Sequence, residues 1–328
     1  MLALATWLAV RRETDLGDGK RADYKRHAFE GNLWIEARKR ESRRTFSRGA
    51  VVRHLADNFG NGLSSFFPAW QTGLEFEGNT HCRPNLSDAA QRCLDRLGTD
   101  VEDLFYHVVA VVHDPSYRKA NEGALRIEWP RIPVPGWSSE DDGAADALVR
   151  SARRGREVAA ALVGEDSIRG FNSQPLRPGF ATIAAPSTTD GALMQGEDYD
   201  VDAGWGHIRS SDAVMPGHGR VAERGYTGEE AGALGEMLPL LGETTFDVYL
   251  NRTTFLRNIP ANVWQYERGG YQVLKTWLSY RERAILGRPL RAEEVEDLVQ
   301  AARRIAWLNI VTGSAQQFGY LEADAGLP

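Results

Sequence analysis

The sequence lacks the short motifs that identify most nucleotide-dependent and hydrolytic enzymes. Its 328 residues contain no G-x-x-x-x-G-K-[ST] phosphate loop, no G-x-G-x-x-G turn opening a helix and no G-x-S-x-G nucleophile elbow. These absences argue against P-loop nucleotidases, dinucleotide-dependent oxidoreductases and α/β-hydrolases. We therefore predict no catalytic residue in this chain.

Cysteine is almost absent as well, because only Cys82 and Cys93 occur. So few cysteines argue against a disulfide framework and favour a reducing compartment, so we expect a cytoplasmic protein. His81 beside Cys82 could begin a metal site, but no second C-x-x-C or H-x-x-x-H completes the ligand set. No metal is expected.

Long hydrophobic runs are missing too. The first ten residues, MLALATWLAV, are apolar but too few to span a bilayer, and no basic stretch precedes them as in a signal peptide. We interpret them as a buried strand of a domain that lacks its beginning, and we expect no membrane partner. Hydrophobic residues at 42% and charged residues at 26% are typical of a globular protein.

The net charge of −6 conceals an uneven distribution. Residues 1–53 carry 13 Lys and Arg against 7 Asp and Glu, and residues 252–304 carry 10 against 6. Between residues 187 and 247 the balance reverses to 3 against 12. Because polyanion binding depends on where cations gather, the two basic ends permit a basic groove. A solvated charged surface is the alternative.

Helical signals dominate from residue 84 to residue 164. Residues 99–102, Thr-Asp-Val-Glu, form a capping box that opens the run Leu104–His113. That run is apolar nearly all round, which predicts a buried helix. His107 and His113 within it are interpreted as core or helix-end histidines in preference to catalytic ones.

The character of the chain changes between residues 165 and 250, where glycine, proline and acidic residues accumulate. Short runs at 182–185 and 246–250 predict strands. Tight loops at 188–191 and 204–207 carry polar side chains. Loops on a rigid sheet are where recognition usually takes place, so these loops are candidate binding segments.

Residues 259–283 form an aromatic and basic block. Val263–Tyr266 alternates as a half-buried strand would, and Gly269-Gly270 suits a sharp strand-to-helix corner. Helical spacing from Tyr271 to Arg281 predicts a helix after the corner. Residues 293–310 predict a final amphipathic helix.

Several stretches resemble the C-terminal part of type ISP restriction-modification enzymes, which combine nuclease, helicase, adenine methyltransferase and specificity domains in one chain. They are residues 103–113, PSYR at 115–118, LRIEWPRIP at 125–133, TTDG at 188–191, GWGH at 204–207, DVYLN at 247–251 and WQYERGGYQVLKTWLSYR at 264–281. The last segment is long and specific. The resemblance extends over about two thirds of the chain, whereas the first 80 residues match only loosely.

The resemblance implies a DNA target-recognition domain with its helical spacer. We expect an α+β fold with a remnant of the methyltransferase region at residues 1–80 and a helical spacer at 81–165. Residues 166–328 would form a mixed β-sheet recognition domain with C-terminal helices packed back on it. The family's methyltransferase uses S-adenosylmethionine to modify adenine. The N/D-P-P-Y/F tetrapeptide of amino-group DNA methyltransferases is absent here.

This chain is therefore expected to be a truncated product or a specificity fragment that needs a partner, without a cofactor of its own. Its expected partners are double-stranded DNA and a methyltransferase or helicase-nuclease polypeptide.

Candidate DNA-binding residues fall into two groups. Cations that would hold phosphates are Arg38, Arg40, Arg43, Arg44, Arg252, Arg257, Arg268 and Lys275. Side chains that could contact base edges are Thr188, Thr189, His207, Arg209, Asn251, Asn258 and Gln272. Gly269 and Gly270 are included because they form the predicted strand-to-helix corner.

Two alternatives stay open at this point. One is an adenine-specific DNA methyltransferase whose motifs have diverged. The other is a protein-interaction module in which the helical spacer docks a methyltransferase or translocase and touches no DNA.

Overall fold

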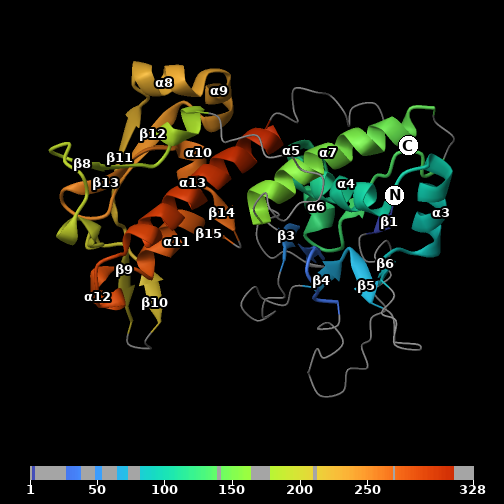
Figure 1. The fold of residues 1–328 in the computed structure, drawn as a ribbon, viewed down its shortest axis with the longest axis horizontal. Coiled ribbons are helices and arrows are strands. Elements are labelled where there is room, and N and C mark those ends of the chain that lie inside the picture. Colours follow the sequence, from blue (N-terminus) through green and yellow to red (C-terminus); the bar gives the residue numbers. More distant parts are fainter. Residues whose placement is uncertain are drawn as a thin grey trace. The chain divides into compact units, whose positions relative to one another are not determined.

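A computed structural model describes residues 2–3, 27–37, 49–53, 65–72, 82–138, 142–163, 178–209, 213–268 and 270–313. The chain divides into two compact units, and both combine helices with strands (Figure 1). Unit 1 comprises Met1–Asn172 and Val311–Pro328, and unit 2 comprises Ser173–Ile310. The α+β class predicted from the sequence is confirmed. The three-part division at residues 80 and 165 stays a prediction.

Unit 1 is built around two long helices that lie side by side, α4 (Val101–His113) and α7 (Ala144–Val163) (Figure 1). Every residue of α4 from Leu104 onward is buried, as the apolar run predicts. The two backbones approach so closely that a Cβ at Gly155 of α7 would overlap the carbonyl oxygen of Tyr106 in α4. Such contact requires glycine at this position.

The other described helices of unit 1 are shorter. These are α3 (Asp88–Leu97), α5 (Pro115–Ala120) and α6 (Glu122–Leu125). The N-cap of α4 is Asp100, whose side chain accepts a hydrogen bond from the Asp103 amide. The capping box predicted one residue earlier, with Thr99 as the cap, is therefore wrong. Aspartate serves as well as threonine at this position, and Asp103 lies three residues beyond it.

The strands of unit 1 are short and antiparallel. β2 (Trp34–Ala37) lies between β3 (Ala50–Val52) and β4 (Ser65–Pro68). β5 (Trp70–Thr72) pairs with β6 (Cys82–Pro84), and β1 (Leu2–Ala3) pairs with β7 (Arg131–Ile132). The strand expected at the start of the chain is thus present at its second and third residues. Residues 4–10 lie outside the described part.

Both histidines of α4 belong to the core, as expected. His107 lies between the Ser151 hydroxyl (2.8 Å from Nδ1) and the Pro133 carbonyl oxygen (2.7 Å from Nε2). Because a carbonyl oxygen can only accept, Nε2 carries the proton and donates a hydrogen bond to the Pro133 carbonyl oxygen. Burial lowers the pKa of His107 to about 4, so the ring is neutral. His113 Nε2 lies 2.8 Å from the Gly49 carbonyl oxygen and connects α4 to the segment before β3.

Unit 2 contains a four-stranded sheet in the order β11-β12-β13-β8. The strands are β11 (Arg220–Gly225), β12 (Thr244–Tyr249), β13 (Thr254–Pro260) and β8 (Ala185–Thr188). Every described strand pair is antiparallel, so the mixed sheet that we expected is corrected to an antiparallel one. Short connections such as the β12–β13 turn permit this, since parallel neighbours would need long crossovers.

The helices of unit 2 are mostly short. They are η2 (Pro178–Thr182), η3 (Gly196–Tyr199), α8 (Gly228–Leu234), η4 (Gly235–Met237), α9 (Leu238–Leu241), α10 (Ala261–Trp264), α11 (Val273–Ser279), α12 (Arg283–Leu286) and the start of α13 (Ala292–Gly313). The apolar stripe of α13 enters the same core as Phe246 and Leu256 of the sheet. The final amphipathic helix is thereby confirmed, and its apolar stripe packs into the core of unit 2.

The aromatic block differs from its prediction in two places. Val263 and Trp264 lie in the one-turn helix α10, not in a strand, because both side chains enter the core together. β14 (Glu267–Arg268) and β15 (Tyr271–Gln272) pair as an antiparallel hairpin, so β14 is followed by a second strand and not by the predicted strand-to-helix corner. The helix that follows, α11, begins two residues later than predicted. Its buried face carries Leu274 and Leu278.

None of the helices in the described part of the chain combines the length and apolar character that crossing a bilayer requires.

Candidate functional site

The four-stranded sheet has a core face and an outer face, which its register assigns residue by residue. Val248 pairs with Leu256 on the core face, and both are buried. One residue along, Arg220, Tyr249 and Phe255 form a row on the other face. Side chains alternate between faces along each strand, so Arg224, Asp247 and Arg257 belong to the same outer face. We call this surface the outer face of the sheet.

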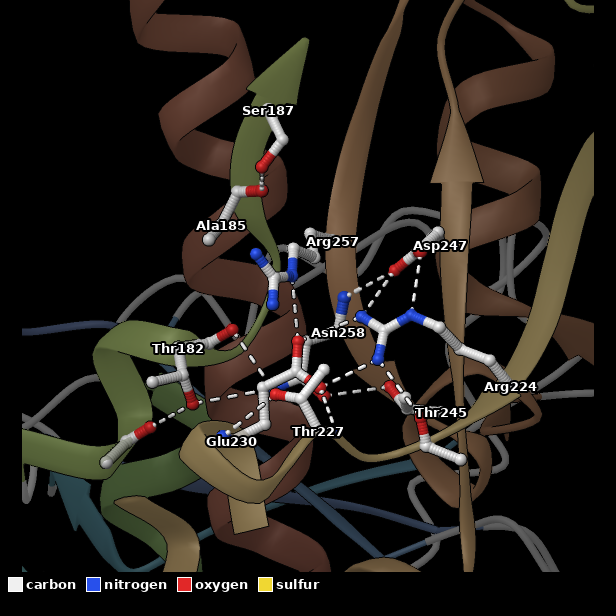
Figure 2. Close-up of polar contacts among 12 residues, drawn as sticks. Thr182, Ala185, Ser187, Arg224, Thr227, Glu230, Thr245, Asp247, Arg257 and Asn258 are labelled. Atoms are coloured by element: carbon white, nitrogen blue, oxygen red, sulfur yellow. Dashed lines mark hydrogen bonds and ion pairs between the residues drawn. The ribbon is translucent and has the colours of Figure 1, made fainter. Parts of the chain in front are cut away.

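An ion-pair network occupies the middle of the outer face (Figure 2). The Arg224 guanidinium holds both oxygens of Asp247, at 2.8 Å and 2.9 Å, and both oxygens of Glu230, at 2.7 Å and 2.9 Å. Arg257 donates from Nε to Glu230 Oε1 at 2.8 Å. Two cations thus meet two carboxylates. The charge of Arg257, which we expected to hold a phosphate, is offset by Glu230.

Glu230 reaches this network because α8 begins beside the sheet. The Thr227 hydroxyl accepts from the Glu230 amide, and the Glu230 carboxylate accepts from the Thr227 amide, which completes a capping box. Burial alone would raise the pKa of Glu230, which is 4% exposed. Hydrogen bonds from Arg224, the Thr227 amide and Arg257 outweigh burial and lower the pKa to about 2.

Asn258 joins this network from the interior, because its backbone amide donates to Asp247 Oδ1 at 3.0 Å. Its side chain is fully buried, donates to the Thr182 carbonyl oxygen at 3.1 Å and accepts from the Thr245 hydroxyl at 3.0 Å. Its backbone has a positive φ of 61°, a conformation that asparagine tolerates better than most residues. The pairing of β12 with β13 shifts register beside it. The structure therefore corrects Asn258 from a base contact to a residue that shapes β13.

A second group of predicted residues lies where the loop after β8 meets the β12–β13 turn, a region that we call the loop end of the sheet. The Thr189 amide donates to the Thr253 carbonyl oxygen at 2.9 Å, which joins the loop after β8 to the β12–β13 turn. Thr189 and Arg252 are exposed there. Thr188 is nearly buried, and its hydroxyl donates to the Ala192 carbonyl oxygen at 2.8 Å. Two of the predicted residues, Thr189 and Arg252, thus remain available to a ligand at this loop end.

Asn251 organises this loop end from inside. It is 8% exposed, and its amide nitrogen donates to the carbonyl oxygens of Asp198 and Asp200, both at 3.0 Å. Its side-chain oxygen accepts from the backbone amides of Thr253 and Thr254, both at 2.9 Å. The amide is therefore committed within the fold, and its predicted contact with a base is corrected to a structural role.

His207 and Arg209 extend from the same region on a small hairpin. β9 (Gly206–Ile208) pairs with β10 (Val214–Pro216), and both predicted side chains are exposed. The buried Glu282 carboxylate accepts the backbone amides of Gly204 (3.1 Å) and Trp205 (2.7 Å) just before β9. The base of the hairpin is thus anchored in the core, while its side chains face outward.

The predicted residues of the aromatic block lie on β14, β15 and α11. Arg268 and Lys275 are half-buried, and Gly270 has a positive φ of 77° that suits the hairpin turn. The Gln272 side chain donates to the Trp264 carbonyl oxygen at 3.4 Å, a weak contact that leaves the amide half-buried. α11 packs against β9 and β10, and a Cβ at Gly206 would overlap the Ser279 carbonyl oxygen. α11, which carries Lys275, therefore lies next to the hairpin of His207 and Arg209.

Five predicted residues, Arg38, Arg40, Arg43, Arg44 and Gly269, lie outside the described residues. The structure adds three residues that the sequence analysis missed: Arg220, Tyr249 and Phe255. The alternation of arginine, alanine and arginine at residues 220, 222 and 224 was a signal that one face of a strand carries cations. The aromatic partners could be found only from the register of β11, β12 and β13.

Much of the acidic excess in the middle of the sequence is bound within unit 2. Asp190 accepts from the Ala192 amide, and Asp198 accepts from the Gln195 amide. Asp200 forms an ion pair with Arg283 at 2.9 Å. Glu230 and Asp247 are bound to Arg224, as described above. Within the described residues, no cluster of three or more His, Cys, Asp or Glu side chains has the geometry to hold a metal ion.

Comparison with solved structures shows the same fold in a much larger protein. A cryo-EM structure of a DrdV–DNA complex matches 86% of this chain and 24% of its own chain, with a TM-score of 0.50 and 20% identity.

Two Type ISP restriction-modification enzymes match less closely. The ATP-dependent enzyme LlaBIII bound to DNA gives a TM-score of 0.45 and 16% identity, over 89% of this chain and 16% of its own. A nuclease-deletion mutant of LlaGI with a DNA substrate mimic gives 0.41 and 17%, over 90% and 21%. The chain therefore spans about a quarter or less of the length of these proteins.

No curated protein matches the sequence. The family model described as the Type ISP C-terminal specificity domain, in contrast, matches residues 5–304. That match covers most of the chain and confirms the resemblance found in the sequence. The chain belongs to the family of Type ISP C-terminal specificity domains.

Proposed function

We propose that this chain recognises a specific sequence in double-stranded DNA, as the specificity part of a Type ISP-like restriction-modification enzyme. The observation that carries the proposal is the family match over residues 5–304. The similar solved structures are complexes with DNA or a DNA mimic, which agrees with this function. Methylation and cleavage would be carried out by other domains or by a partner polypeptide in the cytoplasm.

The loop end of the sheet and the β9–β10 hairpin offer exposed polar and cationic side chains on rigid supports. Arg252, together with Arg268 of β14 and Lys275 of α11, would hold phosphates, while Thr189 and His207 would lie near base edges. Gln272 and Arg209 complete the set of candidate base contacts. Arg257 would contribute less, because its charge is paired with Glu230.

The selection experiment uses the full chain and a pool of duplexes with a random central segment. Repeated capture and sequencing should enrich one short site, because base contacts distinguish sequences by about 1–3 kcal/mol per well-formed pair. A pool that stays random after repeated capture would contradict the proposal. Capture of a methyltransferase or translocase with no enrichment of any duplex would favour a protein-interaction module in its place.

A separate part of the proposal is that another domain or polypeptide carries out methyl transfer. S-adenosylmethionine would be bound by the methyltransferase of the complete enzyme and not by this chain. Incubation of the purified chain with DNA and labelled S-adenosylmethionine should therefore transfer no label. Labelled adenine in the product would instead establish a methyltransferase with divergent motifs.

A further inference from the structure

Three arginines belong to the outer face of the sheet, and one of them differs from the other two. Arg224 and Arg257 are both bound to carboxylates. Arg220 has no carboxylate contact among the described residues. Its guanidinium instead lies over the Tyr249 ring, 3.9 Å from the ring centre, and Nη1 donates to the Arg252 carbonyl oxygen at 3.3 Å. Within the described part of the chain, the charge of Arg220 thus lies on an exposed surface without an acidic partner.

The ring below Arg220 is itself held in place. Tyr249 packs against Phe255 with ring centres 5.1 Å apart and planes tilted by 32°. The Tyr249 carbonyl oxygen accepts from the indole nitrogen of the fully buried Trp205 at 2.7 Å. Because the ring and the backbone beneath it are fixed from two sides, the position of the guanidinium above the ring is fixed as well.

The backbone that leads to Arg220 is equally constrained. Gly219 has a φ of 68°, and its amide donates to the Gly204 carbonyl oxygen at 3.0 Å. A Cβ at Gly219 would overlap the Trp205 ring, so only glycine fits there. Arg220 therefore starts from a rigid backbone and ends on a rigid aromatic surface, beside the loop end where Thr189 and Arg252 are exposed.

This arrangement favours recognition of a base over neutralisation of a phosphate. A guanidinium that lies over a ring keeps N–H groups along its edge available to a ligand, and the planar fork can donate two parallel hydrogen bonds. The N7 and O6 acceptors of guanine match that fork in the major groove. A phosphate requires only a cation within reach, which a mobile surface side chain supplies without an aromatic support.

We propose that Arg220, seated on Tyr249, recognises a guanine in the target duplex by donating to its N7 and O6. This inference rests on the proposed function and deepens it, because it names one base and the residue that selects it. Tyr249 is a positioning residue that acts through Arg220, and Phe255 supports the ring.

The test repeats the duplex selection with the full chain carrying Arg220→Ala, and with Arg252→Ala as the matched control. Arg220→Ala should lose the preference for guanine at one position, with discrimination there falling about tenfold or more, while the other positions keep their preferences. Arg252→Ala should keep every base preference and weaken binding to all duplexes alike. The slope of the logarithm of the binding constant against the logarithm of salt concentration should become shallower by about one.

A uniform loss of affinity in Arg220→Ala, with the reduced salt slope expected of Arg252→Ala, would make Arg220 a phosphate contact and overturn the inference. An unchanged set of preferences would overturn it too. In both cases the wild-type chain still selects a site, so the proposed function survives. Failure of the wild-type chain to select any site removes the proposed function and this inference together.

Variants of the ring separate positioning from folding. Tyr249→Leu should lose the same guanine preference as Arg220→Ala, whereas Tyr249→Phe should keep it, because the ring face alone seats the guanidinium. Thermal unfolding of each variant checks that the chain is folded at the temperature of selection. Equal behaviour of the Phe and Leu variants in the selection would contradict the role given to the ring.

Discussion

At the scale of single residues, unit 2 uses buried carboxylates to fix the parts that surround its exposed loops. Glu230 holds two arginines and the first turn of α8, and Glu282 holds two backbone amides before β9. A buried charge costs free energy unless it is fully bonded, so removing any one partner leaves the others uncompensated. These residues are therefore expected to matter for stability rather than for contact with a ligand.

Replacing Glu230 by glutamine should destabilise unit 2 by about 3 kcal/mol, because Arg224 and Arg257 then lose a buried anionic partner. Denaturant unfolding followed by tryptophan fluorescence measures the change. Glu229→Gln is the matched control: it alters the neighbouring, exposed residue of the same helix and should change stability by less than about 0.5 kcal/mol. Equal effects of the two substitutions would refute the role of the network.

The same network predicts how stability depends on pH. The pKa of Glu230 is lowered from 4.5 to about 2 in the folded chain, so its stabilisation is complete above a pH of about 4.5 and lost as the pH falls through about 2. The difference in unfolding free energy between the wild type and Glu230→Gln should therefore be constant near neutral pH and shrink in acid. A difference that stays constant down to pH values of about 2 would exclude this linkage.

At the scale of elements, sequence patterns predicted long helices better than short turns. The apolar run of α4 and the stripe of α13 repeat over several turns, so their type and burial could be predicted. Residues 263–266 offered only one alternating pair, which a strand and a one-turn helix satisfy equally. Packing of Val263 and Trp264 into the core decided between them, and that packing depends on residues distant in the sequence.

The close approach of α4 and α7 gives a prediction about this pair of helices. Gly155→Ala should destabilise unit 1 by about 1–3 kcal/mol or more, because the added methyl group would overlap the Tyr106 carbonyl oxygen and force the helices apart. Thermal unfolding monitored by circular dichroism measures the loss. Gly123→Ala in α6 is the control, since no atom lies near its added Cβ and alanine favours helix. A Gly155→Ala variant as stable as the control would disprove the close contact.

At the scale of the whole molecule, the candidate site could be predicted only in part. Loop position and residue type identified Thr189, His207 and Arg252, which the structure leaves exposed. The same criteria could not distinguish them from Asn251 and Asn258, whose side chains point inward because their hydrogen-bond partners lie on other segments. The row of Arg220 with Tyr249 was missed because it depends on strand register, which a sequence alone does not reveal.

The most direct test of DNA recognition compares two duplexes of equal length and composition, the selected site and a scrambled version of it. The dissociation constants of the full chain for both are measured across a roughly fourfold range of salt. We predict that the selected duplex binds at least about a thousandfold more tightly at physiological salt, and that both affinities fall as salt rises. Equal dissociation constants at every salt concentration, or no binding to either duplex, would contradict the account.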